Sequence, residues 1–277
     1  MQNYEKTGYL NSHFKMFHLN DSKKINIDFH YHDFHKILIF LQGNVTYCIE
    51  GRNYDLQPND IVFVNAGEVH CPIIHDDSCY ERIIIYISKD FLSLYQNPQN
   101  DLSLCFKSAL KNQSHVLRIP SFKESKLSMI TTELENAFSS CEYANELFLD
   151  TLFIEFMVHL NRASLTNKIE YISTNSSNQK IIDIIDYLNK NLTKDINIDL
   201  LADTFYISRY HLMHTFKKAT GYTIGEYIKT KRLLYARDLI QNGKGITDAC
   251  YACGFKNYST FLRAYRKNFG CSPSKNS

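Results

Sequence analysis

Two stretches near the C-terminus decide the fold, because they are two copies of one pattern. Residues 198–221 read IDLLADTFYISRYHLMHTFKKATG, and residues 246–270 read ITDACYACGFKNYSTFLRAYRKNFG. Each copy opens with apolar residues at i, i+3, i+4 and i+7, which is the stripe of a short amphipathic helix. After a tight turn, each continues into a second helix that is basic. The sequence therefore predicts two helix-turn-helix units.

The same residue types mark the ends of both second helices. Ser208 and Asn257 stand at the N-cap positions, where a side-chain oxygen accepts a hydrogen bond from a free backbone N–H of the first turn. Gly221 and Gly270 stand at the expected C-terminal stops. Residues 225–241 predict a long amphipathic helix between the units. The two recognition helices would then enter major-groove segments about 34 Å apart on one face of DNA.

The core positions of the second helices fix which residues face DNA. Leu212 and Phe216, like Phe261 and Tyr265, lie four residues apart and are expected in the core. The predicted DNA-facing residues are Tyr210, Met213, His214, Lys217 and Lys218 in the first helix, with Arg209 at its start, and Ser259, Leu262, Arg263, Arg266 and Lys267 in the second.

These residues have different expected roles. Arg263 is the predicted base reader, because its forked guanidinium can bond O6 and N7 of one guanine. The lysines are expected to contact phosphates, which position a protein without reading sequence. Tyr210, Met213 and Leu262 offer apolar contacts to thymine methyl groups. The alternative, an ordinary solvated basic face, is disfavoured because caps, core positions and basic positions are all duplicated.

Charge divides the chain into two parts. The chain has 31 Lys and Arg and 29 Asp and Glu; residues 178–277 hold 16 and 8 of them, so this part carries +8 and the remainder −6. A basic part beside an acidic one is typical of a domain that binds a polyanion. We predict an N-terminal domain at 1–163, a linker at 164–178 and a DNA-binding domain at 179–277.

The N-terminal part has a different pattern. Short β-rich runs at 37–41, 45–50, 61–64 and 82–87, with turn residues between them, predict an antiparallel sandwich or barrel. Apolar residues at helical intervals then predict two helices, at 122–140 and 143–162. These helices either only pack on the sheet or also form a subunit interface. The predicted fold class is α+β with two domains, the second an all-α double helix-turn-helix.

The apolar runs and the eight cysteines indicate the cellular compartment of the protein. The first twenty residues contain no apolar run long enough for a signal peptide, and the chain has no run of 18 apolar residues. We therefore expect a cytoplasmic protein without a membrane segment and with reduced thiols. Cys250 and Cys253 form a C-x-x-C pair that could bind zinc or act in redox chemistry. They share the apolar stripe of their helix, which predicts core residues instead.

Three histidines in six residues, HYHDFH at 30–35, raise the question of a metal site. In an extended strand His30 and His32 share one face, as two ligands of one ion would. The chemistry of this stretch depends on what surrounds it in the fold.

The C-terminal hundred residues resemble the AraC/XylS family of bacterial transcription regulators. The resemblance covers ISRYHLMHTFKKATGYTIGEYIKTKRLLYARDLI and GITDACYACGFKNYSTFLRAYRKNFGCSPSK, with both units, the connecting helix and the closing G-x-S-P at residues 270–273. It implies that both recognition helices read DNA, with contacts from Tyr210, Met213, His214, Tyr258, Ser259, Leu262 and Arg263. His214 stands where a long basic side chain is frequent and Leu262 is less polar than usual, so the base preference does not carry over.

Residues 30–70, HYHDFHKILIFLQGNVTYCIEGRNYDLQPNDIVFVNAGEVH, are similar to the cupin-like effector domain of the same family. A metal-binding cupin would place a carboxylate where this chain has Lys36 and a proline where it has Asn65. A lysine ammonium repels a divalent cation, so we expect no metal and no other cofactor. His30, His32, Lys36 and His70 are the predicted effector pocket; the alternative leaves the histidines as surface or structural residues.

The combined prediction is a sequence-specific DNA-binding transcription regulator, most often an activator in this family, and not an enzyme. The expected partners are double-stranded DNA, a small-molecule effector, RNA polymerase and a second copy of the chain. One alternative is a cupin-type metal enzyme domain tethered to DNA, with His30, His32 and His70 as ligands. Another is a DNA-binding protein without sequence preference.

Overall fold

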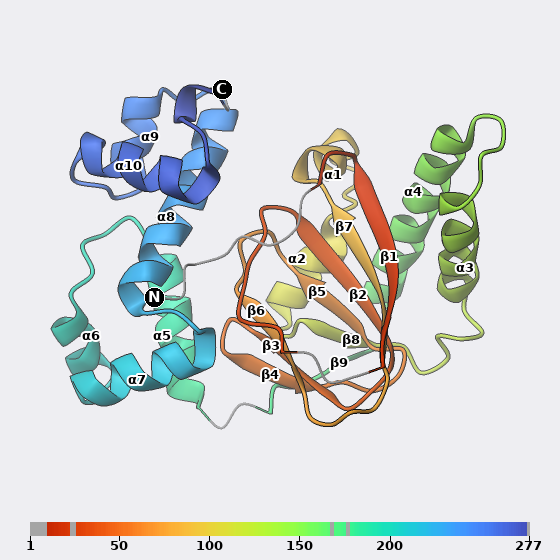
Figure 1. Ribbon diagram of the computed structural model, residues 1–277, viewed down its shortest axis with the longest axis horizontal. Coiled ribbons are helices and arrows are strands. Elements are labelled where there is room, and N and C mark those ends of the chain that lie inside the picture. The colour runs from red at the N-terminus through yellow and green to blue at the C-terminus, as the bar shows by residue number, and fades with distance from the viewer. Residues whose placement is uncertain (1–9, 23–25, 167–168, 176–177, 276–277) are drawn as a thin grey trace.

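The N-terminal half forms two antiparallel β-sheets that face each other (Figure 1). The computed structural model describes residues 10–22, 26–166, 169–175 and 178–275. The six-stranded sheet has the order β1-β7-β2-β5-β8-β9 and the three-stranded sheet the order β4-β3-β6. The strands are β1 Phe14–Asp21, β2 His35–Gln42, β3 Val45–Ile49, β4 Arg52–Asp55, β5 Ile61–Val64, β6 His70–Ile74, β7 Tyr80–Ile87, β8 Val116–Arg118 and β9 Glu170–Tyr171.

Alternation along the strands gives the larger sheet two apolar faces. Leu38 and Phe40 of β2 point between the sheets, where they pack with Tyr47 of β3. Ile37 and Ile39 point to the other face and join the core that the helices cover. In the described residues no continuous ladder joins the two sheets, so the predicted cupin-like barrel is a sandwich of two facing sheets.

Four helices cover the outer face of the larger sheet. They are α1 Lys89–Leu94, α2 Leu104–Lys111, α3 Lys126–Phe138 and α4 Asn145–Ser164. The two helices predicted at 122–140 and 143–162 are confirmed as α3 and α4. Helix α3 begins later than predicted because the Ser125 hydroxyl accepts a hydrogen bond from the Ser128 N–H and so caps it. Helices α3 and α4 lie at the end of the molecule far from the C-terminal helices (Figure 1).

The C-terminal part is entirely helical, and the predicted α+β, two-domain fold class is confirmed. Its helices are α5 Gln179–Lys190, α6 Ile198–Thr204, α7 Arg209–Thr220, α8 Ile224–Gln241, α9 Ile246–Ala252 and α10 Tyr258–Phe269, followed by a 3₁₀ turn at Pro273–Lys275. The caps are as predicted: Ser208 accepts from the His211 N–H and Asn257 from the Thr260 N–H. Helix α5 was not predicted. Cys250 and Cys253 are buried core residues, as expected.

The segment between the two parts is bonded to both sheets. Within the predicted linker, residues 164–178, the strand β9 pairs with β8, with Leu117 opposite Tyr171. Thr174 and Asn175 hydrogen-bond to the backbone of Asn53. The predictions also cover residues 1–9, 23–25, 167–168, 176–177 and 276–277, which lie outside the described residues.

The two parts share apolar contacts at their junction. Val69, from the loop between β5 and β6, belongs to the apolar core formed by α5, α6, α7 and α8. Gly221, which ends α7, lies against the side chain of Phe29. Gly221 and Gly270 are equivalent in the repeat and both have positive φ, 75° and 72°, a conformation that costs other residues about 1–2 kcal/mol.

This equivalence gives a matched pair of substitutions. A Cβ at Gly221 would lie 2.6 Å from the Cβ of Phe29, whereas a Cβ at Gly270 would meet nothing within 4 Å. Both Gly221→Ala and Gly270→Ala should lower the free energy of unfolding through strain, but Gly221→Ala should lower it by about 1–2 kcal/mol more. Urea unfolding of both variants measures the difference. Equal losses would show that the Phe29 contact contributes nothing.

Candidate DNA-binding face and effector pocket

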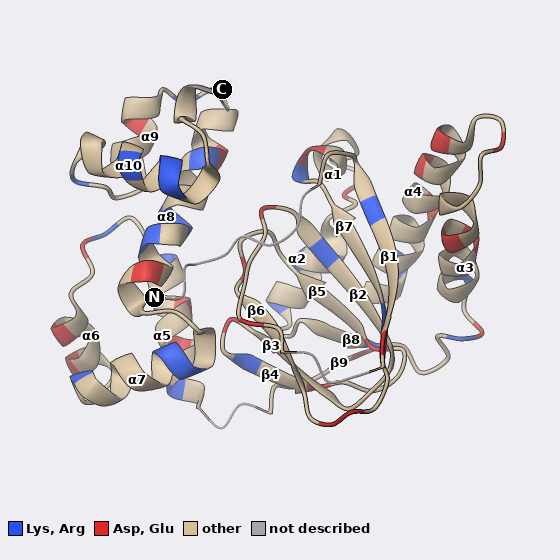
Figure 2. Ribbon diagram, in the orientation of Figure 1, with Lys and Arg blue, Asp and Glu red and all other residues tan. Residues whose placement is uncertain are grey.

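Helices α7 and α10 present their basic faces outside the core, as the sequence predicts. Leu212 and Phe216 of α7 and Phe261 and Tyr265 of α10 are fully buried. The opposite sides are solvent-exposed, and Figure 2 shows Lys and Arg on both helices. The exposed members of the predicted set are Arg209, Tyr210, Met213, His214, Lys217, Lys218, Ser259, Arg263, Arg266 and Lys267.

The predicted DNA-facing residues differ in their burial and in their ion pairing. Tyr258 and Leu262 are half-buried against the core of the second unit, so only part of each side chain can reach DNA. Arg209 forms an ion pair with Asp199 of α6 at 2.8 Å. Among the described residues, neither Arg263 nor Lys217 takes part in an ion pair, which leaves their charges available for DNA.

A cavity of about 520 Å³ opens at one end of the β-sandwich. Its walls include Leu38 and Ile84 from the larger sheet and Tyr47 from the smaller one. Gly221 and Tyr222, the two residues that follow α7, complete the wall. The Tyr222 hydroxyl donates a hydrogen bond to the Phe29 carbonyl oxygen. The cavity therefore lies between the N-terminal sandwich and the first helix-turn-helix unit.

Lys36 places a buried amine in this cavity wall. Its residue exposure is 5%, and its Nζ donates to the Tyr47 hydroxyl at 2.8 Å. In the described part of the chain no carboxylate forms an ion pair with it. Burial, together with the charge of Arg82, lowers the pKa of Lys36 to about 7. Arg82 is itself buried and is paired with Asp21.

The three predicted pocket histidines cluster beside Lys36. The ring of His70 lies 4.3 Å from that of His30 and 4.7 Å from that of His32, centroid to centroid. Each donates its Nδ1–H to a backbone carbonyl oxygen. Burial, with the charge of Lys36, lowers the pKa of His30 to about 4 and those of His32 and His70 well below the ordinary value, so all three are neutral at pH 7.

The structure brings two of the four predicted pocket residues to the cavity. His30 and Lys36 line it, whereas His32 and His70 are not part of its lining, and the buried Nε2 atoms of these two histidines have no hydrogen-bond partner among the described residues. Among the described residues, no group of three or more His, Cys, Asp or Glu side chains has an arrangement that could hold a metal ion. Sequence reasoning missed Arg82, Tyr47 and Tyr222 as cavity residues.

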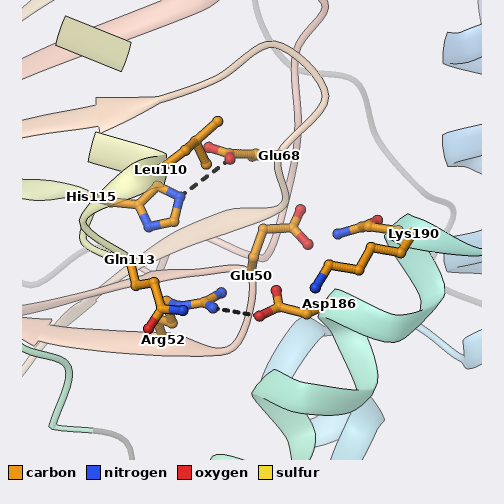
Figure 3. A pocket seen from close by; sticks show the side chains of 9 residues that line it. Glu50, Arg52, Glu68, Leu110, Gln113, His115, Asp186 and Lys190 are labelled. Atoms are coloured by element: carbon orange, nitrogen blue, oxygen red, sulfur yellow. Dashed lines mark hydrogen bonds and ion pairs between the residues drawn. The ribbon is translucent and has the colours of Figure 1, made fainter. Parts of the chain in front are cut away.

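A second cavity, of about 400 Å³, lies between the sandwich and α5 (Figure 3). Its polar side chains largely satisfy one another: Arg52 pairs with Asp186 at 2.9 Å, and His115 pairs with Glu68 at 3.2 Å. Glu50 accepts from Lys231 of α8 at 2.8 Å and from the Tyr227 hydroxyl. These groups therefore join the two parts of the chain.

Helix α8 carries most of the polar contacts that join the two parts. Lys231 also donates to the Gly67 carbonyl oxygen at 2.9 Å. Arg237 pairs with Asp33, next to the predicted pocket histidines. Asp238 pairs with Lys89 at 2.9 Å. The helix that connects the two DNA-binding units is therefore fixed against the sandwich.

Both parts of the chain match known protein families. A family model described as an AraC-like ligand binding domain matches residues 18–156, half of the chain, and one described as a helix-turn-helix domain matches residues 201–276. The chain belongs to the AraC family. This AraC-family protein is a DNA-binding transcription regulator with a ligand-binding domain, and the family resemblance inferred from its sequence is confirmed. No helix in the described residues is long and apolar enough to cross a membrane.

Relatives of this AraC-family protein match along most of its length. It is 26% identical over 249 residues to the HTH-type transcriptional activator RhaS of Shigella sonnei, covering 88% of this chain and 85% of that protein. RhaS of an Escherichia coli K12 strain is 25% identical over 249 residues with the same coverage. The solved structure of ToxT from Vibrio cholerae is 17% identical and covers 95% of this chain and 97% of its own, with a TM-score of 0.38.

Proposed function

We propose that this AraC-family regulator activates transcription when a small-molecule effector occupies the cavity beside Lys36. The observation that carries the proposal is that Gly221 and Tyr222, directly after α7, form part of the cavity wall. A ligand there contacts both the sandwich and the first DNA-binding unit, so it can favour one arrangement of the two over another. Activation is supported by the RhaS relatives, which are named transcriptional activators.

We assign the DNA contacts residue by residue. Arg263 reads a base from α10, and Arg266, Lys267, Lys217 and Lys218 contact phosphates. Exposure of all five and the absence of ion pairs to them among the described residues support this assignment. Arg209, Tyr210, Met213, His214, Tyr258, Ser259 and Leu262 complete the proposed interface. Residues 1–163 and 179–277 are the proposed domains.

A second copy of the chain and RNA polymerase are the further proposed partners. Helices α3 and α4 and the turn between them expose large apolar side chains, namely Met129, Phe138, Tyr143, Leu147 and Phe148. Such a face supports a homodimer through these helices. We propose a cytoplasmic location because the DNA target is there. We propose no catalytic role, since the relatives are regulators.

Selection from random duplex DNA with the full-length protein supplies the site on which to test these roles. Two half-sites about 10 bp apart would show that both helices read DNA. If binding collapses with salt and no sequence is enriched, the protein binds DNA without sequence preference.

On the selected site, Arg263→Ala should weaken binding by about 1–3 kcal/mol and relax the preference at one base pair. Lys217→Ala should weaken binding to the selected site and to random DNA alike, and should lower the salt slope. Titrations at several salt concentrations measure both. Arg162→Ala, which removes an exposed charge from α4, is the control and should change neither affinity. Equal losses on selected and random DNA would overturn the base-reading role of Arg263.

A further inference from the structure

We propose that Tyr206, in the turn between α6 and α7, is a further DNA-contacting residue whose hydroxyl donates a hydrogen bond to a phosphate beside the groove that α7 enters. This inference rests on the proposed DNA-binding face of α7 and adds a residue to it. Three features of the turn support the assignment: the backbone conformation of Tyr206, the exposure of its ring, and a lysine, Lys180, that lies next to it.

The first support is the backbone of Tyr206. Its φ is 50°, in the left-handed region that residues with a Cβ disfavour. Its N–H donates to the Asp203 carbonyl oxygen at 3.2 Å, and the Ile207 N–H donates to the Ala202 carbonyl oxygen at 3.0 Å. This pair of bonds is a common helix ending in which glycine is preferred at the first position. The equivalent turn of the second unit has the same two bonds and has Gly254 there, with a φ of 91°.

The rest of the DNA-binding domain uses glycine wherever it adopts this conformation. Apart from Tyr206, each residue with positive φ in the described part of this domain is a glycine, and the others are Gly221, Gly243 and Gly270. A Cβ at Gly243 or at Gly270 would meet nothing within 4 Å, so it is the positive φ, not a lack of space, that favours glycine at both. Tyr206 therefore has a backbone strain that the chain avoids at similar places.

The second support is the exposure of the Tyr206 side chain. Tyr206 is 90% exposed and belongs to none of the apolar cores. Among the described residues, its ring contacts no other ring and its hydroxyl has no hydrogen-bond partner. Packing therefore does not offset the strain. Strained residues of this kind are typical of functional sites.

The position of the turn indicates which function this is. Tyr206 stands two residues before Ser208, which caps α7. In helix-turn-helix complexes the first residues of the recognition helix contact base edges, and the preceding helix crosses the DNA backbone. The turn between the two helices therefore lies close to phosphates. Tyrosine is among the residues that donate hydrogen bonds to phosphate oxygens.

The third support is the positive charge beside the turn. Lys180, in the first turn of α5, donates from its Nζ to the Tyr206 carbonyl oxygen at 3.4 Å. Lys180 is exposed, and no carboxylate of the described residues forms an ion pair with it. Its ammonium has three N–H donors, so it keeps donors for a second partner. A phosphate at this turn would meet both the Tyr206 hydroxyl and the Lys180 ammonium.

Urea unfolding of the full-length protein and its titration with the selected duplex and with random duplex DNA test the proposal. Tyr206→Gly removes the strain together with the ring. Its urea midpoint should stay or rise, while its affinity for both duplexes should fall about fivefold. Tyr206→Phe removes only the hydroxyl and should lose a similar affinity at an unchanged urea midpoint. Lys180→Met should weaken binding to both duplexes and lower the salt slope by about 1.

Gln113→Gly is the matched control for the strain. Gln113 is exposed, follows α2 in the N-terminal domain and has a φ of 52°. It ends its helix with the same two backbone bonds, from its own N–H to Leu110 and from the Ser114 N–H to Ala109. Gln113→Gly should also keep or raise the urea midpoint, but its affinity for DNA should equal that of the wild type.

Wild-type DNA affinity in Tyr206→Gly, in Tyr206→Phe or in Lys180→Met overturns the proposal. If Tyr206→Gly binds DNA as the wild type does but activates a reporter promoter less, Tyr206 contacts a protein instead of DNA. A lower urea midpoint in Tyr206→Gly than in the wild type would show that the ring stabilises the fold, and this also overturns the proposal. Selection of a two-part site by the wild type, with the loss expected for Arg263→Ala, would leave the proposed function intact in each of these cases.

Discussion

Glu50→Ala should lower the free energy of unfolding of the full-length protein by about 3 kcal/mol. Glu50 is 4% exposed and lies where the sandwich meets α8. Its carboxylate accepts hydrogen bonds from Lys231 at 2.8 Å, from the Tyr227 hydroxyl and from the Val69 N–H at 2.7 Å. In Glu50→Ala the partly buried Lys231 ammonium has lost its carboxylate partner, and the buried Val69 N–H has lost its hydrogen-bond acceptor. Removing one partner of a buried pair lowers the free energy of unfolding by more than the net contribution of the pair, because the other partner stays buried and unpaired.

Urea unfolding of four proteins isolates this contact: wild type, Glu50→Ala, Lys231→Met and the double variant. Each single variant removes the same ion pair. The free energy of unfolding should therefore fall by less in the double variant than the sum of its decreases in the two single variants. Lys107→Met is the control, since Lys107 forms an exposed pair with Asp101 and should lose less than about 1 kcal/mol. Strictly additive losses would show that Glu50 and Lys231 do not stabilise each other.

The elements predicted from sequence were those with a strong periodic pattern. The duplicated caps, apolar stripes and glycines located α6, α7, α9 and α10, because each is a local signal. Strand β6 was missed because Pro72 lies within it. A proline lacks the N–H of a central strand, but β6 is an edge of its sheet and tolerates it. Helix α5 has the same kind of local signal, an apolar stripe at Ile181, Ile184, Ile185 and Leu188, and was nevertheless not predicted.

The site was predicted less completely than the fold, for a physical reason. His30 was named from the HYHDFH stretch and Lys36 from the similarity to the cupin-like effector domain, and both line the cavity. Arg82 was hidden within an apolar strand, although its alternation with Ile84 and Tyr86 was a usable signal for an inward position. Tyr222 could not be assigned from sequence. It reaches the cavity only because the second domain packs on the first, through contacts between residues far apart in the chain, such as Glu50 and Lys231.

Lys36→Met should raise the free energy of unfolding by about 3 kcal/mol at pH 6 and by close to zero at pH 9.5, in the absence of a ligand. Burial lowers the pKa of Lys36 from 10.5 to about 7 in the folded protein. The unfolded chain therefore holds this proton between pH 7 and 10.5 while the folded chain has released it. The wild-type protein must then gain stability as the pH rises through this window, and the full cost of the buried charge remains below pH 7.

Methionine removes that cost because it has a similar length and no charge. Part of the gain is lost because the Tyr47 hydroxyl keeps its buried position without the Lys36 amine. Urea unfolding of both proteins at the two pH values measures the difference, and Lys111→Met should follow the wild-type pH dependence. If the difference in free energy of unfolding between wild type and Lys36→Met does not change with pH, Lys36 is charged and paired at both pH values. In that case an anion within the fold, rather than a ligand, would have to accompany the lysine.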